Sequence, residues 1–180
     1  MAGIYTDVRA AIRKGALAAL SEFTTPIVIF SHENGPEPSV SYVVVNILNI
    51  EQQGHHSTST LANANETLTF QVAYEVMCQL SFIGSLSGDM SQSFTQNINN
   101  NPLTRLELQR NKLGLMRKSQ IRRAPQKRDT KWVEYHNLDV TFNYIVITDQ
   151  LVDVVEGVVI ADEASEIPVI IKIPESIIYP

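Results

Sequence analysis

The sequence contains few residues whose types and spacing suit catalysis. The nearest candidate is the run Gly-Ser-Leu-Ser-Gly at residues 84–88. A nucleophilic serine commonly lies in a Gly-x-Ser-x-Gly turn between a strand and a helix, and both serines here fall one position off that pattern. The run therefore predicts a strand-to-helix turn with serine capping. Because the sequence also has no Gly-x-x-x-x-Gly-Lys or Gly-x-Gly-x-x-Gly phosphate-binding loop, we expect a protein that is not an enzyme.

The histidine pair at residues 55–56 and the single cysteine predict neither a metal site nor a reactive thiol. His55 and His56 are adjacent, so their side chains would point apart in a strand, and no Cys, Asp or Glu lies at a useful offset for a metal site. We interpret both as solvated. Cys78 lies between Val76 and Leu80 in an apolar alternation, which is typical of a buried and unreactive thiol. The sequence predicts neither a metal site nor a cofactor.

The strongest unusual signal is a cluster of charge. Residues 110–131 carry nine basic side chains and one acidic one, for a charge of +8, whereas the rest of the chain is −13. Such asymmetry favours an anionic partner or charge matching between copies of the protein. The candidate interface or lumen residues are Arg117, Lys118, Arg122, Arg123, Lys127, Arg128 and Lys131 on the basic side, with Asp153, Glu156, Asp162 and Glu163 near the C-terminus on the acidic side.

Three interpretations of the basic segment stay open. It pairs with the acidic region of a neighbouring copy or lines a pore, or it is a solvated surface, or it contacts nucleic-acid phosphates. The third interpretation predicts binding that falls steeply with salt and that is abolished, without loss of assembly, by charge reversal at Arg122, Arg123, Lys127 and Arg128. Only Trp132, at the edge of the segment, is available for base stacking.

Composition limits the fold. A chain of 180 residues with 44% hydrophobic and 18% charged residues fits one globular domain, which we predict to span residues 1–180. No apolar run approaches the roughly 20 residues that a bilayer span needs, and no apolar signal region follows the basic residues near the N-terminus. A single cysteine cannot form a disulfide within the chain. We expect synthesis in the cytoplasm and no membrane association.

Hydrophobic periodicity predicts an α+β fold. Apolar residues at helical spacing indicate helices over residues 5–22 and 86–99, with a shorter helical turn over 103–112. Apolar, β-branched or alternating runs indicate strands over residues 27–30, 40–50, 67–82, 115–121 and 133–147, and another over 151–160. We predict an antiparallel or mixed sheet of four to six strands with two helices packed on one face.

Three segments fall outside this compact pattern. Residues 51–65 are polar and predict the mobile tip of a long hairpin. Residues 122–131 predict a basic loop. Residues 163–180 form a C-terminal extension whose apolar part, residues 167–173, has the composition of a strand. Such a strand either completes the chain's own sheet or adds to a neighbour's edge.

Residues 114–157 resemble the C-terminal half of the phage neck and tail terminator (tail-completion) family. The matching features are a strand beginning at Gly114, a loop with Pro125 and Asp129, then Trp132, and the alternating residues 138–144 followed by residues 149–155. The front half agrees in layout, with an N-terminal helix, a short strand ending near Phe30, a proline-rich turn and a long strand opened by Tyr42. The layout covers most of residues 5–157.

The resemblance implies a structural virion protein at the head–tail junction, or neck, of a tailed bacteriophage. Family members cap the tail tube as a ring, usually of six copies, stop tube polymerisation and provide a docking surface for head-completion or connector proteins. The implied partners are other copies, the tail tube or sheath protein, the connector, and genomic DNA passing through the lumen. No catalytic residues or cofactors are expected. The basic residues 122–131 and the extension after Glu163 depart from the family pattern, so they leave the junction partner open.

A closed ring needs two different patches of one chain that meet. The basic segment and the acidic C-terminal region provide such a pair, so the sequence predicts a ring. The alternative function is a nucleic-acid-binding module that uses residues 110–131, and a metabolic enzyme would require a pocket with converging polar groups. Electron micrographs distinguish these classes, because only the first predicts visible rings.

Overall fold

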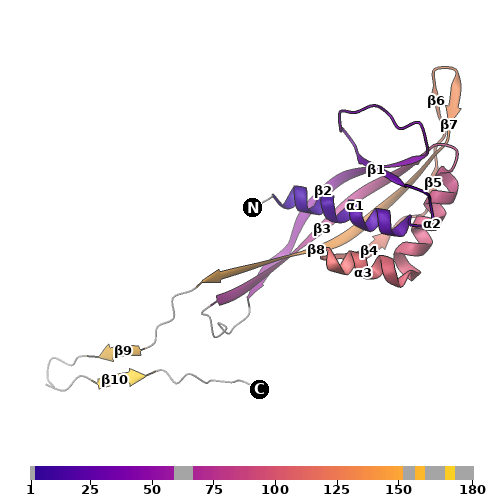
Figure 1. Ribbon diagram of the computed structural model, residues 1–180. Helices are drawn as coiled ribbons and strands as arrows, with labels where there is room; N and C mark the ends of the chain where they lie inside the picture. The colour runs from indigo at the N-terminus through magenta and orange to yellow at the C-terminus, as the bar shows by residue number, and fades with distance from the viewer. Residues whose placement is uncertain (1–2, 59–66, 152–156, 161–168, 173–180) are drawn as a thin grey trace. The chain divides into compact units, whose positions relative to one another are not determined.

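The computed structural model describes residues 3–58, 67–151, 157–160 and 169–172 (Figure 1). Contacts divide the chain into two units. The first contains Met1–Ser57 and Gln71–Ile147, and the second contains Thr58–Phe70 and Thr148–Pro180. The expectation of one domain over residues 1–180 stays a prediction.

Three helices occur among the described residues of the first unit. α1 (Ile4–Ala19) buries a stripe at helical spacing that consists of Val8, Ala11, Ile12, Gly15, Ala16 and Ala19. α2 (Ser87–Asn100) and α3 (Pro102–Arg110) meet at Asn101, whose side-chain oxygen accepts a hydrogen bond from the Leu103 amide at 2.9 Å. Asparagine at the cap and proline at the first helical position suit a helix start. The predicted helical turn over residues 103–112 is therefore a full helix, α3. The described structure has three helices in this unit, whereas two were predicted to pack on the sheet.

A mixed sheet lies against these helices. Its order is β1 (Ile27–Phe30), β2 (Tyr42–Thr58), β3 (Thr67–Ile83), β8 (Tyr135–Leu151) and β4 (Leu113–Lys118), and β5 (Arg122–Arg123) also pairs with β8. β1 runs parallel to β2, whereas β4 and β5 run antiparallel to β8. Figure 1 shows the helices beside the sheet, and their buried residues join one core with it. The predicted α+β class with a mixed sheet of four to six strands is confirmed.

The main core fills the space between the helices and the sheet. β8 contributes Leu138, Val140, Phe142 and Tyr144, which alternate along the strand as predicted. β3 contributes Val76, Cys78, Leu80 and Phe82 in the same way. Phe82 packs against Phe94 of α2, with ring centres 5.7 Å apart. Every second side chain over residues 76–82 and 138–144 of the two central strands is thus buried in this core.

A second, smaller apolar cluster forms apart from the main core. Its buried members are Tyr42, Ile83 and Tyr135, and Ile27, Ile29, Val44 and Val133 pack against them. Tyr42 and Val44 on β2 and Ile83 on β3 are adjacent in sequence to main-core residues, so they lie on the opposite face of the sheet.

Two segments predicted as loops contain strands. β2 continues through Thr58, into the polar stretch 51–65, because backbone pairing does not require apolar side chains. Residues 59–66 lie outside the described residues. Residues 122–131 contain β5 and most of a hairpin made by β6 (Gln126–Arg128) and β7 (Lys131–Val133). Asp129 turns this hairpin at a φ of 51°, a left-handed conformation that aspartate tolerates better than most residues.

Side chains close the outer edge of β1. The Ser31 amide donates to the Val45 carbonyl of β2, so the preceding amide, that of Phe30, points away from the sheet. Glu33 Oε2 accepts a hydrogen bond from this Phe30 amide at 3.1 Å, and Glu33 Oε1 pairs with Arg9. The Arg9 guanidinium lies 4.4 Å from the centre of the Phe30 ring. The carboxylate therefore occupies a backbone donor that an additional strand would need.

Residues 84–88 form the predicted turn from strand to helix. Gly84 has a φ of 109°, and a Cβ at this position would lie 2.9 Å from Ser41 Cα, so glycine is required. The Ser41 hydroxyl, and not a serine of the run, accepts a hydrogen bond from the Leu86 amide at 3.0 Å. Ser87 is buried, with its Oγ 3.0 Å from His136 Nδ1. The run is a structural turn, and the predicted serine capping is wrong, because the N-cap residue of α2 is Leu86 and its side chain makes no capping hydrogen bond.

Cys78 is expected to be unreactive in the folded protein. It is fully buried, and its Sγ donates to the Val140 carbonyl at 3.5 Å. Burial, with the charge of Asp139 as a second cause, raises the pKa of Cys78 to about 12. Because the thiolate is the reactive form, a thiol reagent at about pH 8 should leave the native protein unlabelled and modify one cysteine after unfolding in guanidinium. Rapid labelling of the native protein would contradict this burial.

The second unit contains a two-stranded antiparallel sheet. β9 (Gly157–Ile160) pairs with β10 (Val169–Lys172), with Ile160 opposite Val169 and Gly157 opposite Lys172. The apolar part of the predicted C-terminal extension therefore forms a strand that pairs within the chain. The other residues of the extension lie outside the described residues.

Candidate assembly surface

Most of the basic segment is paired within the chain. Arg117 donates to Glu75 Oε1 at 2.6 Å and to the Thr141 hydroxyl at 3.1 Å. Arg122 pairs with Asp139 at 2.5 Å. Asp139 and Thr141 alternate with the core residues of β8, so both contacts lie on the sheet face opposite the main core. These two arginines are bound to their own sheet.

Two further arginines also have partners. Arg123 forms two hydrogen bonds with the Glu134 carboxylate, at 2.5 and 2.9 Å. This forked contact raises the pKa of Arg123 and lowers the pKa of Glu134. Arg128 pairs with Glu37, in the segment between β1 and β2. Exposed pairs of this kind stabilise the fold little, so their main effect is to fix where the side chains lie.

Lysines 118, 127 and 131 differ in their surroundings. Lys118 donates to the Thr95 carbonyl of α2 at 2.8 Å. Lys127 and Lys131 are exposed, and neither forms an ion pair with any residue that the structure describes. Of the seven basic candidates, these two alone keep a charge without a partner in the described part of the chain.

Both lysines belong to the hairpin arm, which we define as residues 126–133. Lys127 lies opposite Trp132, and Arg128 lies opposite Lys131. Because opposed residues share a face of a hairpin, Lys127 and Trp132 form one face, and Lys131 shares the other with Arg128. Trp132 is 70% exposed. Tryptophan is enriched among the residues that contribute most to binding at protein interfaces, so an exposed tryptophan marks a candidate contact.

The acidic candidates are not placed by the structure. Asp153, Glu156, Asp162 and Glu163 lie outside the described residues. Their pairing with the basic segment stays a prediction. Five of the seven basic candidates have partners within the chain, and the other two, Lys127 and Lys131, lie on the hairpin arm.

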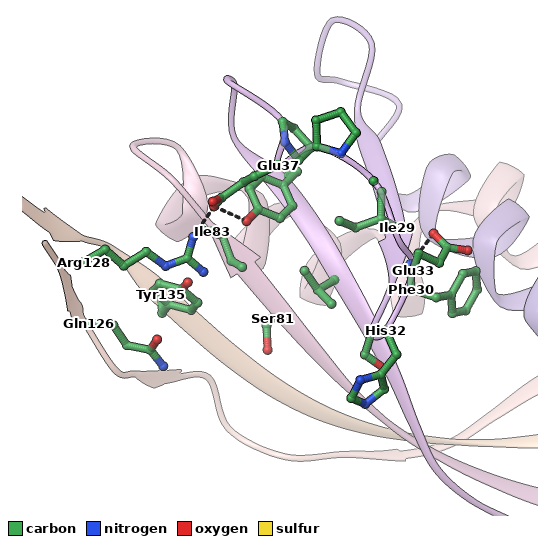
Figure 2. Close-up of a pocket in the computed structure, with 16 residues that line it drawn as sticks. Ile29, Phe30, His32, Glu33, Glu37, Ser81, Ile83, Gln126, Arg128 and Tyr135 are labelled. Atoms are coloured by element: carbon green, nitrogen blue, oxygen red, sulfur yellow. Dashed lines mark hydrogen bonds and ion pairs between the residues drawn. The ribbon is translucent and has the colours of Figure 1, made fainter.

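An open pocket of about 410 Å³ lies beside the hairpin arm (Figure 2). Its lining includes residues 31–33 and 35–38 after β1, Gln126 and Arg128 of the arm, and side chains from β1, β2, β3 and β8. Sequence reasoning missed this pocket because its lining comes from segments far apart in the chain. The one available signal was the apolar character of Val44, Ile83 and Tyr135 on the face opposite the main core.

At one end of this pocket, the Glu37 carboxylate is bound by two side chains. Its Oε1 accepts a hydrogen bond from the Tyr42 hydroxyl at 2.6 Å and pairs with Arg128. The Tyr42 hydrogen bond, and then the charge of Arg128, lower the pKa of Glu37. Burial, together with Glu37, raises the pKa of Tyr42 to about 12. The Arg128 guanidinium lies 5.4 Å from the centre of the Tyr135 ring. The arrangement holds a carboxylate between a phenol and a guanidinium.

Neither a metal centre nor a membrane helix is found in the residues that the structure describes. Within them, no three His, Cys, Asp or Glu side chains lie together as metal ligands. No helix in this part of the chain is long and apolar enough to cross a bilayer.

Comparison with known families covers most of the chain. The sequence profile of the phage neck terminator protein family matches residues 15–167. The chain belongs to the phage neck terminator family. The resemblance in residues 114–157 is confirmed, and membership gives this neck terminator a role in the neck or tail of a phage.

Two solved structures are similar to this neck terminator. One is the sheath/tube terminator of PVC, an extracellular contractile injection system, in its extended state, with 15% identity, a TM-score of 0.44 and 92% of this chain covered. The neck terminator spans 65% of that chain. The other has 14% identity and a TM-score of 0.36, and the match covers 84% of this chain and 99% of the other. The comparison with curated proteins gave no match.

Proposed function

We propose that this neck terminator forms a closed ring that ends the tail tube at the head–tail junction. The family match over residues 15–167 carries this proposal. The ring consists of copies of this chain, with six as the expected number. It contacts the tube or sheath protein on one side and a head-completion or connector protein on the other, and genomic DNA passes through its lumen. The protein is a structural part of the virion without catalytic activity, assembled in the host cytoplasm.

The hairpin arm supports such an assembly. Lys127 and Lys131 have charges without partners in the described part of the chain, and Trp132 is largely exposed. A ring interface joins two different patches of identical chains. The arm is our candidate for one patch, and the acidic residues Asp153, Glu156, Asp162 and Glu163 of the next copy are candidates for the other.

A nucleic-acid-binding module is the weaker proposal. Phosphate binding draws its affinity from several free basic side chains, each of which releases counterions. Arg117, Arg122, Arg123 and Arg128 are held by carboxylates of their own chain. The surface left for phosphate contact is therefore much smaller than the charge of +8 indicates.

The ring is tested by measuring the mass of the purified full chain in solution at about 0.1 M salt, with and without tail tube protein, and by negative-stain imaging of the same samples. We expect circular particles of one stoichiometry. Because charges pair across the proposed interface, assembly should weaken at about 1 M salt, where the screening length falls to roughly 3 Å. A strict monomer in both states would contradict the proposal.

A further inference from the structure

The pocket beside the hairpin arm exposes part of the second apolar cluster. Ile29, Val44 and Ile83 contribute apolar side chains to its lining. Arg128 and Glu37 lie toward one end of the pocket (Figure 2). An apolar sheet surface normally packs against another element. Here an open pocket of about 410 Å³ lies over it. Its size and its mixture of apolar and polar groups suit a short protein segment.

The donors at one end of the pocket are arranged around a carboxylate. Tyr42 and Arg128 both contact the same oxygen of Glu37. The Tyr135 hydroxyl, near the Arg128 guanidinium, is buried and has no hydrogen bond of good geometry among the described residues. Convergent phenol and guanidinium donors favour an ionised carboxylate. Glu37 itself is exposed and lies between β1 and β2, so a competing carboxylate can replace it.

We propose that this pocket binds an acidic, apolar segment from a second copy of the neck terminator, and that Glu37 occupies the carboxylate site until that segment binds. The inference rests on the proposed ring and names one of its contacts. In the ring model, two different patches of one chain must meet. The pocket is one patch, and the segment is the other.

Residues 149–166 have the composition that this pocket requires. They contain six acidic residues, no lysine and no arginine, and Leu151, Val152, Val154 and Val155 separate the first acids. Their carboxylates match the charge of Arg128, and their apolar side chains match the apolar part of the pocket lining. The same chain therefore carries both the pocket and a chemically complementary occupant.

A binding experiment tests the carboxylate site. A labelled synthetic peptide of residues 149–157 is titrated with full-length protein, at protein concentrations where mass measurement shows single copies. We expect Arg128→Gln to weaken binding at least about tenfold, since a charge-assisted contact is lost. Glu37→Gln should tighten binding by about threefold or more, because it removes the competing carboxylate. An unfolded variant cannot give this second result.

Two controls accompany the titration. Arg123→Gln breaks the exposed pair with Glu134, outside the pocket lining, and should change affinity by less than about twofold. A peptide with asparagine and glutamine in place of its acids should not bind. Equal loss of affinity in Arg123→Gln and Arg128→Gln would overturn the assignment of the pocket.

A cross-linking experiment tests whether the occupant comes from another copy. Protein with Ser81→Cys in the pocket is mixed with protein carrying Asp153→Cys and then oxidised; the native Cys78 is buried. We expect mixed disulfide dimers, and none when Gln92→Cys on the exposed face of α2 replaces Ser81→Cys. Absence of mixed dimers from the Ser81→Cys and Asp153→Cys mixture would overturn the second copy as occupant.

The two proposals fail in different ways. Rings that form normally in Arg128→Gln, with neither cross-link nor peptide binding, would overturn the pocket contact and leave the ring intact. A wild-type protein that stays monomeric with tube protein, yet binds the peptide through Arg128, would contradict the ring and support the carboxylate site.

Discussion

Changing Lys127 and Lys131 together to glutamate is expected to weaken ring assembly by at least about 100-fold. Both lysines are exposed on the hairpin arm, without ion-pair partners in the described part of the chain. Placing like charges against an acidic neighbour costs several kcal/mol, and each 1.4 kcal/mol is about tenfold in affinity. The measurement is the fraction of assembled particles against protein concentration, by mass measurement in solution.

The matched control is Arg13→Glu with Lys14→Glu on α1, which makes the same change in net charge. Both residues are exposed and neither forms an ion pair within the described structure. This variant should assemble nearly as well as the wild type. If both double variants lose assembly equally, net charge rather than the hairpin arm controls association, and the proposed interface is wrong.

Replacing Phe82 with alanine is expected to lower the free energy of unfolding by about 3–5 kcal/mol. Phe82 is fully buried on β3, and its ring packs against Phe94 of α2, with the ring planes inclined by 59°. The change removes a large apolar side chain where the sheet meets the helices and leaves a cavity that the core fills only partly. Urea unfolding followed by far-ultraviolet circular dichroism measures the loss.

Leu103→Ala provides the comparison, because Leu103 is a large apolar residue that is 75% exposed on α3. We expect a change within about 0.5 kcal/mol. Similar losses for Phe82→Ala and Leu103→Ala would show that the Phe82 ring is not buried between the helices and the sheet.

The sequence allowed prediction of the elements whose apolar period is regular. Alternation along residues 138–144 predicted which side chains of β8 are buried, and Leu138, Val140 and Phe142 confirm it. The hairpin arm was missed because its residues 126–131 are all polar, so no period distinguishes a strand from a loop there. Its turn at Asp129 depends on local backbone geometry that a charge count does not contain.

The candidate surface could be predicted only in part. Counting charge in residues 110–131 indicated the right region but overstated its free charge, because ion pairs join residues distant in sequence. Glu37 and Arg128 are 91 positions apart, and Glu75 and Arg117 are 42 apart. Such pairings follow from the order of strands in the sheet, which the sequence alone did not establish. The pocket was missed for the same reason.

The closed edge of β1 affects whether two molecules can pair through this strand. Glu33, held by Arg9, occupies the outward amide of Phe30. A strand arriving from another molecule would have to expel a charged group before making its first backbone bond at this position. Fibrous aggregation through this edge is thereby discouraged.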